Sequence, residues 1–516
     1  MEKSVDIRIL ERAHPIWYAI GLIGMLPAIQ FDPKDGSPIY RQLYTKIKSS
    51  ILAQELGRGE KLPPTRELAG LLGLNRTTVS AAYELLEAEG LIRGHVGRGS
   101  FVEGPPASEK HAVEKLDWQA LMAPEEARDA AAAMPASEIS FASSRPSEAL
   151  FPLDAFRATC REVIDSPEAA QILQLGPASG YGPLRRYLLD QARNQGIAGA
   201  DDDILITSGC QQAFDLIQRV LASHGETVLL EDPVYPGLRN VFVRGGARVI
   251  GVPVGDHGVD TEALARLMEK EHPRLVVLTP NFQNPTGTTM PEASRKAVLA
   301  AARRAGVVVV ENDLYGDLRY TGSEIPPLKR LDKSGDTIFL SSFSKIAFPG
   351  LRVGWAVGPK HFIARLTDAK ESCDLHSDQL SQAVLLRFAL SGRLAAHRER
   401  MIARGLERLN ATLAACASEL PQGSRFTHPE GGMNIWIRLP EPVDAAEIAA
   451  RAAREGVSFL PGRHFVVSRP QTQCLRLSFA GLDPERIRAG LSVLGSIVRS
   501  ELDRASKRSG DTNVLV

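Results

Sequence analysis

The stretch SSFSKIAFPGLRVGW, residues 341–355, decides the fold of most of this chain. It follows an apolar run at 337–340, TIFL, which predicts a buried strand. Lys345 therefore lies just past a strand end, with three serines before it and Arg352 seven residues after it. A lysine amine can form a Schiff base with an aldehyde cofactor, while hydroxyl and guanidinium groups hold its phosphate. The stretch makes pyridoxal phosphate the candidate cofactor, although a surface lysine at a helix start also fits these residues taken alone.

Composition and charge predict a globular protein of several domains. The 516 residues predict roughly two to four domains, and a hydrophobic content of 44% suffices for a large core. Lys+Arg and Asp+Glu both number 61, so a nucleic-acid partner has to be sought in local charge. The five cysteines form no CxxC pair, which argues against a zinc site or a disulfide framework and fits a reducing cytosol. We expect no metal.

The first 30 residues contain the apolar run that comes closest to the length of a membrane span. That segment, 16–29, includes Pro27 and falls short of the roughly 18–20 residues of a membrane span. No signal-cleavage pattern follows it. We therefore expect residues 1–30 to be an N-terminal extension, with a membrane anchor as the alternative, and the protein to be cytoplasmic without a membrane partner.

Residues 31–103, called the head below, are predicted to form a helical domain with a wing. Apolar residues at helical spacing between 39 and 52 predict the first helix. A second begins near Thr65, a plausible cap, and ends near Gly73; a third begins at NRTTVS, residues 75–80. Two short helices joined by a turn form a helix-turn-helix, and the glycine-rich residues 91–102 predict a hairpin.

The third helix begins with short polar side chains and one arginine. Such side chains can reach base edges and phosphates of DNA from a helix N-terminus. The pattern LPPTRELA…NRTTVSAAYELLEAEGLI…GRGSFV resembles the winged helix-turn-helix of GntR-type bacterial regulators. The resemblance implies promoter DNA, double-stranded, as the partner, although Ser80 stands where many members have an arginine. It assigns DNA contacts to Arg66, Arg76, Thr77, Thr78, His95 and Gly97. Taken singly, helix capping also explains Thr77, and a solvated charge also explains Arg76.

Residues 104–140 are predicted to be a linker, because they are rich in Ala, Glu, Lys and Pro. About 35 residues suffice to tether a head to another subunit. Residues 141–505, called the body below, follow as an aminotransferase-like domain, and 506–516 are predicted to be a flexible tail. Within the body, 141–175 and the residues from about 361 onward are expected to form a smaller α+β domain.

Seven strand-like runs alternate with helical stretches between residues 203 and 358. This alternation is typical of an α/β domain with a mostly parallel sheet, in which ligands bind beyond the carboxyl ends of the strands. The polar residues that follow the runs are therefore expected to form one site. The runs are 204–207, 227–230, 248–250, 275–278, 307–310, 337–340 and 353–356.

The polar segments suit different parts of pyridoxal phosphate. Cys210 and Gln211 begin a helix, whose free N–H groups suit a phosphate, and Tyr235 can stack on a flat ring. Asn284 lies in an Asn-Pro-Thr-Gly segment and can donate to a phenolate oxygen. Taken alone, this segment is also a plain turn, and Tyr235 also fits a core.

The segment ENDLY, residues 311–315, supplies two further candidates. Asp313 can hold a pyridine nitrogen protonated, which makes the ring an electron sink, and it can also simply cap a turn. Tyr315 can donate to the same phenolate oxygen as Asn284.

These segments, in this order, resemble fold-type I pyridoxal-phosphate enzymes of the aminotransferase family. The resemblance implies an internal aldimine on Lys345, and it makes Arg476 the partner of an effector carboxylate, a task that suits an arginine. Leu175 departs from the family, which commonly has a tyrosine there that reaches the neighbouring subunit's phosphate. The implied phosphate ligands are Cys210, Gln211, Ser342, Ser344 and Arg352.

A GntR-type head joined to an aminotransferase-like body resembles the MocR/GabR group of bacterial transcriptional regulators. The resemblance implies a homodimeric, pyridoxal-phosphate-dependent regulator, whose linker permits heads to swap between subunits. A small amine or amino acid would bind the body and change how the heads meet DNA. Two alternatives stay open: an active aminotransferase with an accessory head, and a sensor of pyridoxal phosphate itself. Hydride-transfer, P-loop, zinc-hydrolase and serine-hydrolase motifs are absent from the sequence.

Overall fold

The computed structural model describes residues 31–32, 36–95, 98–104, 116–118 and 137–512, with side chains described to residue 506. The predicted extension at 1–30, the residue Gly97, most of the predicted linker and the end of the predicted tail lie outside these residues. The chain divides into two compact units, 1–125 and 126–516. Among the described residues, no helix has both the length and the apolar character needed to cross a membrane.

The head is a three-helix domain with a two-stranded wing. Gly73, at φ +65°, ends the second helix in the left-handed region, where glycine carries no Cβ penalty. Asn75 caps the third helix by accepting a hydrogen bond from the backbone N–H of Thr77 at 3.3 Å. The core includes Leu43, Leu68 and Val79. The elements are α2 (Ile39–Leu52), α3 (Thr65–Leu72), α4 (Arg76–Ala88), β1 (Ile92–His95) and β2 (Gly99–Val102).

The expected cap at Thr65 is wrong. Thr65 is the first residue of α3, and the position before it is Pro64, whose side chain makes no capping hydrogen bond. Proline can occupy this position because its fixed φ leads the chain into the helix. Since a proline ring offers no hydrogen-bond acceptor, α3 begins without a side-chain cap. The turn at Gly73 and the third helix lie where the sequence predicts them.

The body is built on an eight-stranded mixed sheet in the order β4-β11-β10-β9-β8-β5-β6-β7. All strands run in the same direction except β11 and β7. The seven strands predicted from the sequence are all present, with β7 as an added edge hairpin. The bounds are β4 (Asp202–Thr207), β5 (Thr227–Asp232), β6 (Arg248–Gly255), β7 (Gly258–Val259), β8 (Leu275–Leu278), β9 (Val308–Asn312), β10 (Ile338–Ser342) and β11 (Gly354–Pro359).

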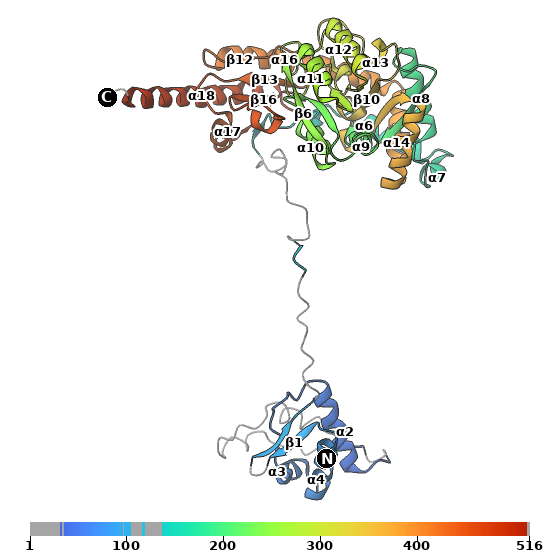
Figure 1. Cartoon of the computed structure of the whole chain (residues 1–516), viewed down its shortest axis with the longest axis vertical. Helices are drawn as coiled ribbons and strands as arrows, with labels where there is room; N and C mark the ends of the chain where they lie inside the picture. Colours follow the sequence, from blue (N-terminus) through green and yellow to red (C-terminus); the bar gives the residue numbers. More distant parts are fainter. Residues whose placement is uncertain (1–30, 33–35, 96–97, 105–115, 119–136, 513–516) are drawn as a thin grey trace. The chain divides into compact units, whose positions relative to one another are not determined.

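Helices cover both faces of this sheet (Figure 1). Successive strand residues point to opposite faces, so Leu230 packs under α9, α10 and α14, while Leu229 packs under α11 and α12. The helices α8 and α15 cover the same face over β4, β10 and β11. Their bounds are α8 (Gly182–Asn194), α9 (Cys210–Leu221), α10 (Pro236–Arg244), α11 (Thr261–Glu271), α12 (Glu292–Ala305), α13 (Leu328–Leu331), α14 (Lys360–Asp374) and α15 (Gln379–Leu390).

A second core belongs to a smaller α+β part of the body. It contains Phe141 and residues from 409 to 498, and it is organised on a four-stranded antiparallel sheet in the order β12-β13-β16-β15. The helix α14 packs on the large sheet instead, because Ile363 and Leu366 are buried against it. The bounds are β12 (Arg425–Phe426), β13 (Asn434–Arg438), β15 (Leu460–Pro461), β16 (Cys474–Ser478), α16 (Arg393–Glu419), α17 (Ala445–Arg454) and α18 (Pro484–Thr512).

A short parallel pair attaches the N-terminal edge of the body to this smaller part. In this pair β3 (Ile139–Ser140) lies beside β14 (Val457–Ser458). The pairing fixes the direction of the following residues, 142–145, which enter the pocket described below. Two helices, α6 (Leu153–Ile164) and α7 (Ala169–Ile172), continue the chain from there.

Candidate functional site

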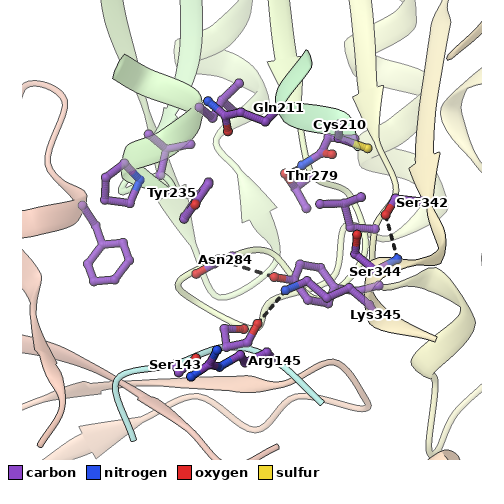
Figure 2. A pocket seen from close by; sticks show the side chains of 18 of the residues that line it. Ser143, Arg145, Cys210, Gln211, Tyr235, Thr279, Asn284, Ser342, Ser344 and Lys345 are labelled. Carbon is purple, nitrogen blue, oxygen red and sulfur yellow. Dashed lines mark hydrogen bonds between the residues drawn. The ribbon is translucent and has the colours of Figure 1, made fainter. Parts of the chain in front are cut away.

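A cavity of about 320 Å³ lies at the carboxyl ends of the central strands of the large sheet. Its lining combines strand ends, the start of α9 and two segments of the smaller part of the body (Figure 2). The structure brings together ten of the predicted site residues there: Cys210, Gln211, Tyr235, Asn284, Tyr315, Ser342, Ser344, Lys345, Arg352 and Arg476. The volume falls in the usual range of small-molecule sites.

The amine of Lys345 is directed into this cavity. Lys345 ends the short helix η6 (Phe343–Lys345), which follows β10 directly. Its Nζ donates to the backbone carbonyl of Ser144 at 2.5 Å and lies 5.4 Å from the centre of the Tyr315 ring (Figure 2). The partners of the amine in these contacts are a carbonyl and an aromatic ring, and neither is a carboxylate. The amine is therefore placed to react with a ligand.

One end of the cavity has the chemistry of an anion site. Arg352 donates to the hydroxyl of Ser344 and to the carbonyl of Ser208, both at 3.4 Å. The N-terminus of α9 lies beside it, where the first backbone N–H groups of a helix have no partner within the helix. Gly209 is required here, since a Cβ at this position would lie 2.4 Å from Nη2 of Arg352. Cationic and N–H donors thus meet around a space that the missing side chain leaves open.

Cys210 and Gln211 line this end, but their side chains are hydrogen-bonded to backbone carbonyls. The Cys210 thiol donates to the carbonyl of Ser341 at 3.3 Å, and burial raises its pKa to about 12. The amide of Gln211 donates to the carbonyl of Gly237 at 3.0 Å. The groups that both residues can offer to an anion are therefore their backbone N–H groups at the start of α9.

The opposite end of the cavity is a linked set of Asn284, Tyr315 and Arg476. The amide of Asn284 donates to the Tyr315 hydroxyl at 3.4 Å and accepts from Arg476 at 3.1 Å. Burial opposes ionisation of Tyr315, but the charges of Lys345 and Arg476 and nearby hydrogen bonds outweigh it, so the pKa of the phenol is lowered. Tyr315 is therefore a strengthened hydrogen-bond donor toward an oxyanion.

Arg476 and Tyr235, both predicted site residues, also line the cavity. Arg476, on β16, is 3% exposed, donates to the carbonyl of Ala142 and lies 5.1 Å from the centre of the Phe465 ring. Tyr235 precedes α10 and remains 42% exposed, with its ring against Gly237. An aromatic face and a buried guanidinium thus border the cavity.

Asp313 differs from the expectation, because it does not line the cavity. Its Oδ1 accepts from the side chain of Asn281 at 3.0 Å and from the backbone N–H of Gly316 at 3.1 Å. The cavity is lined instead by Asn312, the last residue of β9. Alternation along a strand explains the exchange, since two consecutive residues point to opposite faces. The structure thus turns Asp313 toward the loop that follows β9.

Several lining residues were not predicted from the sequence. Segment 142–145 enters through the β3–β14 pair, and Leu460 and Phe465 come from the smaller part of the body. No local pattern marks these residues, because their place depends on contacts between distant parts of the chain. The period-two pattern of β9 does contain a signal for Asn312, since Val310 and Asn312 share one face.

Most of the described residues that are predicted to contact DNA are exposed on the head. Arg66 on α3 is exposed, as are Arg76 and Thr77 at the start of α4, while Thr78 is half-buried. His95 is exposed at the end of β1, with its ring 5.6 Å from that of Phe101. The exposed N-terminus of α4 is a suitable surface for a groove of DNA.

Comparison with known proteins identifies both units. The profile of aminotransferase class I and II matches residues 151–494, about two thirds of the 516 residues. The chain belongs to the aminotransferase class I and II family. The profile described as bacterial regulatory proteins, gntR family, matches residues 39–102, which adds a DNA-binding winged helix-turn-helix to this family's fold.

Two relatives match this chain over most of its length, across both units. The chain is 31% identical over 90% of its length to the uncharacterised HTH-type transcriptional regulator YdfD of Bacillus subtilis, covering 98% of that protein. It is 29% identical over 89% of its length to the probable rhizopine catabolism regulatory protein MocR of Rhizobium meliloti, covering 93% of it. The chain is thus a MocR-like regulator, with a gntR-type head and an aminotransferase-like body.

A solved structure supports the cofactor. LysN, an α-aminoadipate aminotransferase of Thermus thermophilus, matches 75% of this chain and all of its own with 34% identity and a TM-score of 0.70, and it was solved with N-(5'-phosphopyridoxyl)-L-leucine. The cofactor of this fold is pyridoxal phosphate, and the cavity fits it: Lys345 offers an amine, the Gly209 space and Arg352 an anion site, and Tyr315 a donor to an oxyanion.

Proposed function

We propose that this protein is a transcriptional regulator that senses a small amine or amino acid through pyridoxal phosphate bound in its body. The observation that carries the proposal is Lys345, whose amine enters a cavity with an anion site in a chain that also has a gntR-type head. When bound, the cofactor supplies an aldehyde to which amines attach covalently. Promoter DNA would be the second partner, which also implies a cytoplasmic protein.

The residues of the cavity would divide the binding of cofactor and effector between them. We assign the phosphate to Arg352, Ser342, Ser344 and the N–H groups of Cys210 and Gln211, and the ring face to Tyr235. Asn284 and Tyr315 would donate to the phenolate oxygen. Asn284 is hydrogen-bonded to both Tyr315 and Arg476, so Arg476 lies next to the two residues assigned to the phenolate oxygen. This neighbourhood supports the assignment of Arg476 to the effector carboxylate.

Arg476 would also distinguish among effectors. Its guanidinium already donates to the carbonyl of Ala142 and to the side chain of Asn284, so its position is held before any ligand arrives. A held arginine can bind a carboxylate through two parallel hydrogen bonds without losing further side-chain entropy. We therefore favour amino acids over simple amines as effectors.

The DNA-binding assignments on the head remain with Arg66, Arg76, Thr77, Thr78, His95 and Gly97. The exposure of the arginines at the start of α3 and α4 supports them, since phosphates need accessible cations. A homodimer is part of the proposal, with the heads free to swap between subunits. The apolar side chains of Leu173 and Leu175, 64% and 73% exposed, support a second copy covering that surface.

The test uses the full chain and DNA from the promoter region next to its gene. Purified protein with pyridoxal phosphate should show the visible absorbance of a lysine-bound cofactor, and Lys345→Ala should lose this band. Binding of the DNA is then measured with cofactor alone and with a panel of amino acids and amines. A band that persists in Lys345→Ala refutes the assignment of the attachment site. DNA binding that ignores every amine at saturating cofactor refutes amine sensing, and a response to cofactor alone indicates a sensor of the cofactor.

An active aminotransferase is the second candidate, favoured by the 34% identity to LysN. The cavity contains the amine that such chemistry needs for proton transfer, Lys345. Multiple turnovers with any amino acid and keto acid pair, at rates of ordinary enzymes, would establish that candidate. The proposal predicts that such turnover is slow while amine binding still changes DNA binding.

A further inference from the structure

Asn312 has an unused hydrogen-bonding atom at the edge of the cofactor cavity. It is 7% exposed and lines the cavity beside Thr279. Its Nδ2 donates to the Thr279 hydroxyl at 3.1 Å, while its buried Oδ1 has no hydrogen-bond partner among the described residues. Buried polar atoms are almost always paired in folded proteins. An amide with one unpaired end at a ligand cavity indicates that a ligand atom completes its hydrogen bonding.

The neighbouring carboxylate is already engaged elsewhere. Asp313 accepts from Asn281, and the other end of the Asn281 amide accepts from the buried guanidinium of Arg295 at 2.6 Å. A second bond, to the backbone N–H of Gly316, fixes the turn after β9. This chain of contacts holds Asp313 as a part of the loop structure and away from the cavity lining.

The charges around the cavity are one-sided. Among the described residues that line it, four are cationic or guanidinium side chains and none is a carboxylate. The cations are Arg145, Lys345, Arg352 and Arg476. The carboxylate of Glu231 accepts from the backbone N–H of the lining residue Thr279 but does not itself line the cavity. Burial raises the pKa of Glu231 to about 8. Glu231 is therefore largely protonated at neutral pH and adds little negative charge.

We propose that Asn312 is the residue that faces the pyridine nitrogen of the cofactor, and that its neutral amide leaves this nitrogen unprotonated at neutral pH. Turned by 180°, the amide would accept from the Thr279 hydroxyl through Oδ1 and donate from Nδ2 to an unprotonated ring nitrogen. In the orientation described, its Oδ1 would accept from a protonated nitrogen, so the amide binds the ring without selecting the charged form. A carboxylate within about 4–6 Å would raise the proton affinity of the nitrogen by roughly 10- to 1000-fold. The surrounding cations act in the opposite direction.

The consequence deepens the proposed function, on which it rests for the bound cofactor. A protonated ring withdraws electrons from an attached amine and so promotes removal of the proton on its α-carbon. A neutral ring withdraws them less strongly. The site would therefore hold an amino acid without converting it quickly, which suits a sensor and disfavours an enzyme. The same cavity would still discriminate ligands through Arg476.

The protonation state of the ring can be measured directly. The full chain is loaded with pyridoxal phosphate labelled with ¹⁵N in the ring, and the ¹⁵N chemical shift is recorded at pH 7.5. We expect the shift of an unprotonated pyridine in the wild type and of a protonated one in Asn312→Asp. A protonated ring in the wild type refutes the inference while leaving the proposed function intact. Absence of any bound-cofactor absorbance would refute both.

Asp313→Asn serves as the matched control, because it removes a carboxylate one residue away with the same change in shape. We expect its ring ¹⁵N shift to equal that of the wild type, even if its loop is less stable. A change in Asp313→Asn, with none in Asn312→Asp, would show that Asp313 faces the ring and would overturn the inference. A second readout is single-turnover conversion of amino acids, which should be at least about 10-fold faster in Asn312→Asp than in the wild type.

Discussion

Replacing Gly209 by alanine would place one methyl group in the anion site of the body. The added Cβ would lie 2.4 Å from Nη2 and 3.0 Å from Cζ of Arg352, distances at which the guanidinium has to move. Arg352 would then lose its contacts with the carbonyl of Ser208 and the hydroxyl of Ser344. These contacts aim the guanidinium at the start of α9, so the substitution removes one cation from the predicted phosphate site.

Two separate costs follow from the geometry of this glycine. Its backbone, at φ +79° and ψ 169°, lies in a region that is essentially restricted to glycine, which makes alanine destabilising by about 1–3 kcal/mol. A hydrogen bond to a charged group contributes roughly 1.5–3 kcal/mol. Displacement of Arg352 should therefore weaken pyridoxal-phosphate binding by about 10- to 100-fold.

The assay titrates cofactor-free protein with pyridoxal phosphate and follows the visible absorbance of the bound form. Gly225→Ala is the matched control, since this glycine also has a positive φ, +85°, but no atom within 4 Å of an added Cβ. The control should lose stability to urea and keep the cofactor affinity of the wild type. Unchanged affinity in Gly209→Ala would refute the assignment of the phosphate to this end of the cavity. Equal losses in both variants would attribute the effect to destabilisation.

Three further substitutions test other parts of the molecule. Arg76→Ala should weaken DNA binding and reduce the slope of log K against log salt by about 0.9, with unchanged cofactor absorbance, as measured by fluorescence anisotropy over a salt series. Arg476→Lys should reduce the response to amino acids by at least about 10-fold and leave the response to amines without a carboxylate intact, because a lysine cannot form the paired hydrogen bonds. Glu231→Gln should remove a pH dependence of stability. Burial raises the folded-state pKa of Glu231 from 4.5 to about 8, so its contribution to stability is lost as pH rises from 5 through 8, by roughly 3 kcal/mol, as checked by urea unfolding of both proteins at pH 5 and pH 8.

Much of the fold could be predicted because local patterns carry it. Apolar runs bounded by turns gave all seven expected strands of the large sheet, and the helical spacing between 39 and 52 gave α2. The direction of β11 could not be read in this way. An apolar run is the same whichever way it is inserted, and only the pairing of β11 with β4 and β10 makes it antiparallel.

In the candidate site, too, some residues could be predicted from local sequence and others could not. Lys345, Ser342 and Ser344 directly follow a predicted strand, so their common position at its end follows from the parallel sheet. Asn312 and Asp313 are adjacent, and chemistry alone favours the carboxylate as a cofactor ligand. The choice between them depends on the rotation of β9 about its axis, which the packing of Val310 against the α9 face determines.

The sequence by itself determined that a lysine, a guanidinium and a helix start would meet beyond the strands of an α/β body, which follows a winged helix-turn-helix head in the chain. Only the tertiary structure decided what else faces that lysine. It brought in Ser144 through the β3–β14 pair, turned the Cys210 thiol away to Ser341 and put Asn312 in place of Asp313. The physical reason is that strand alternation and long-range pairing fix the direction of a side chain, whereas residue type fixes only what that side chain can do once it is there.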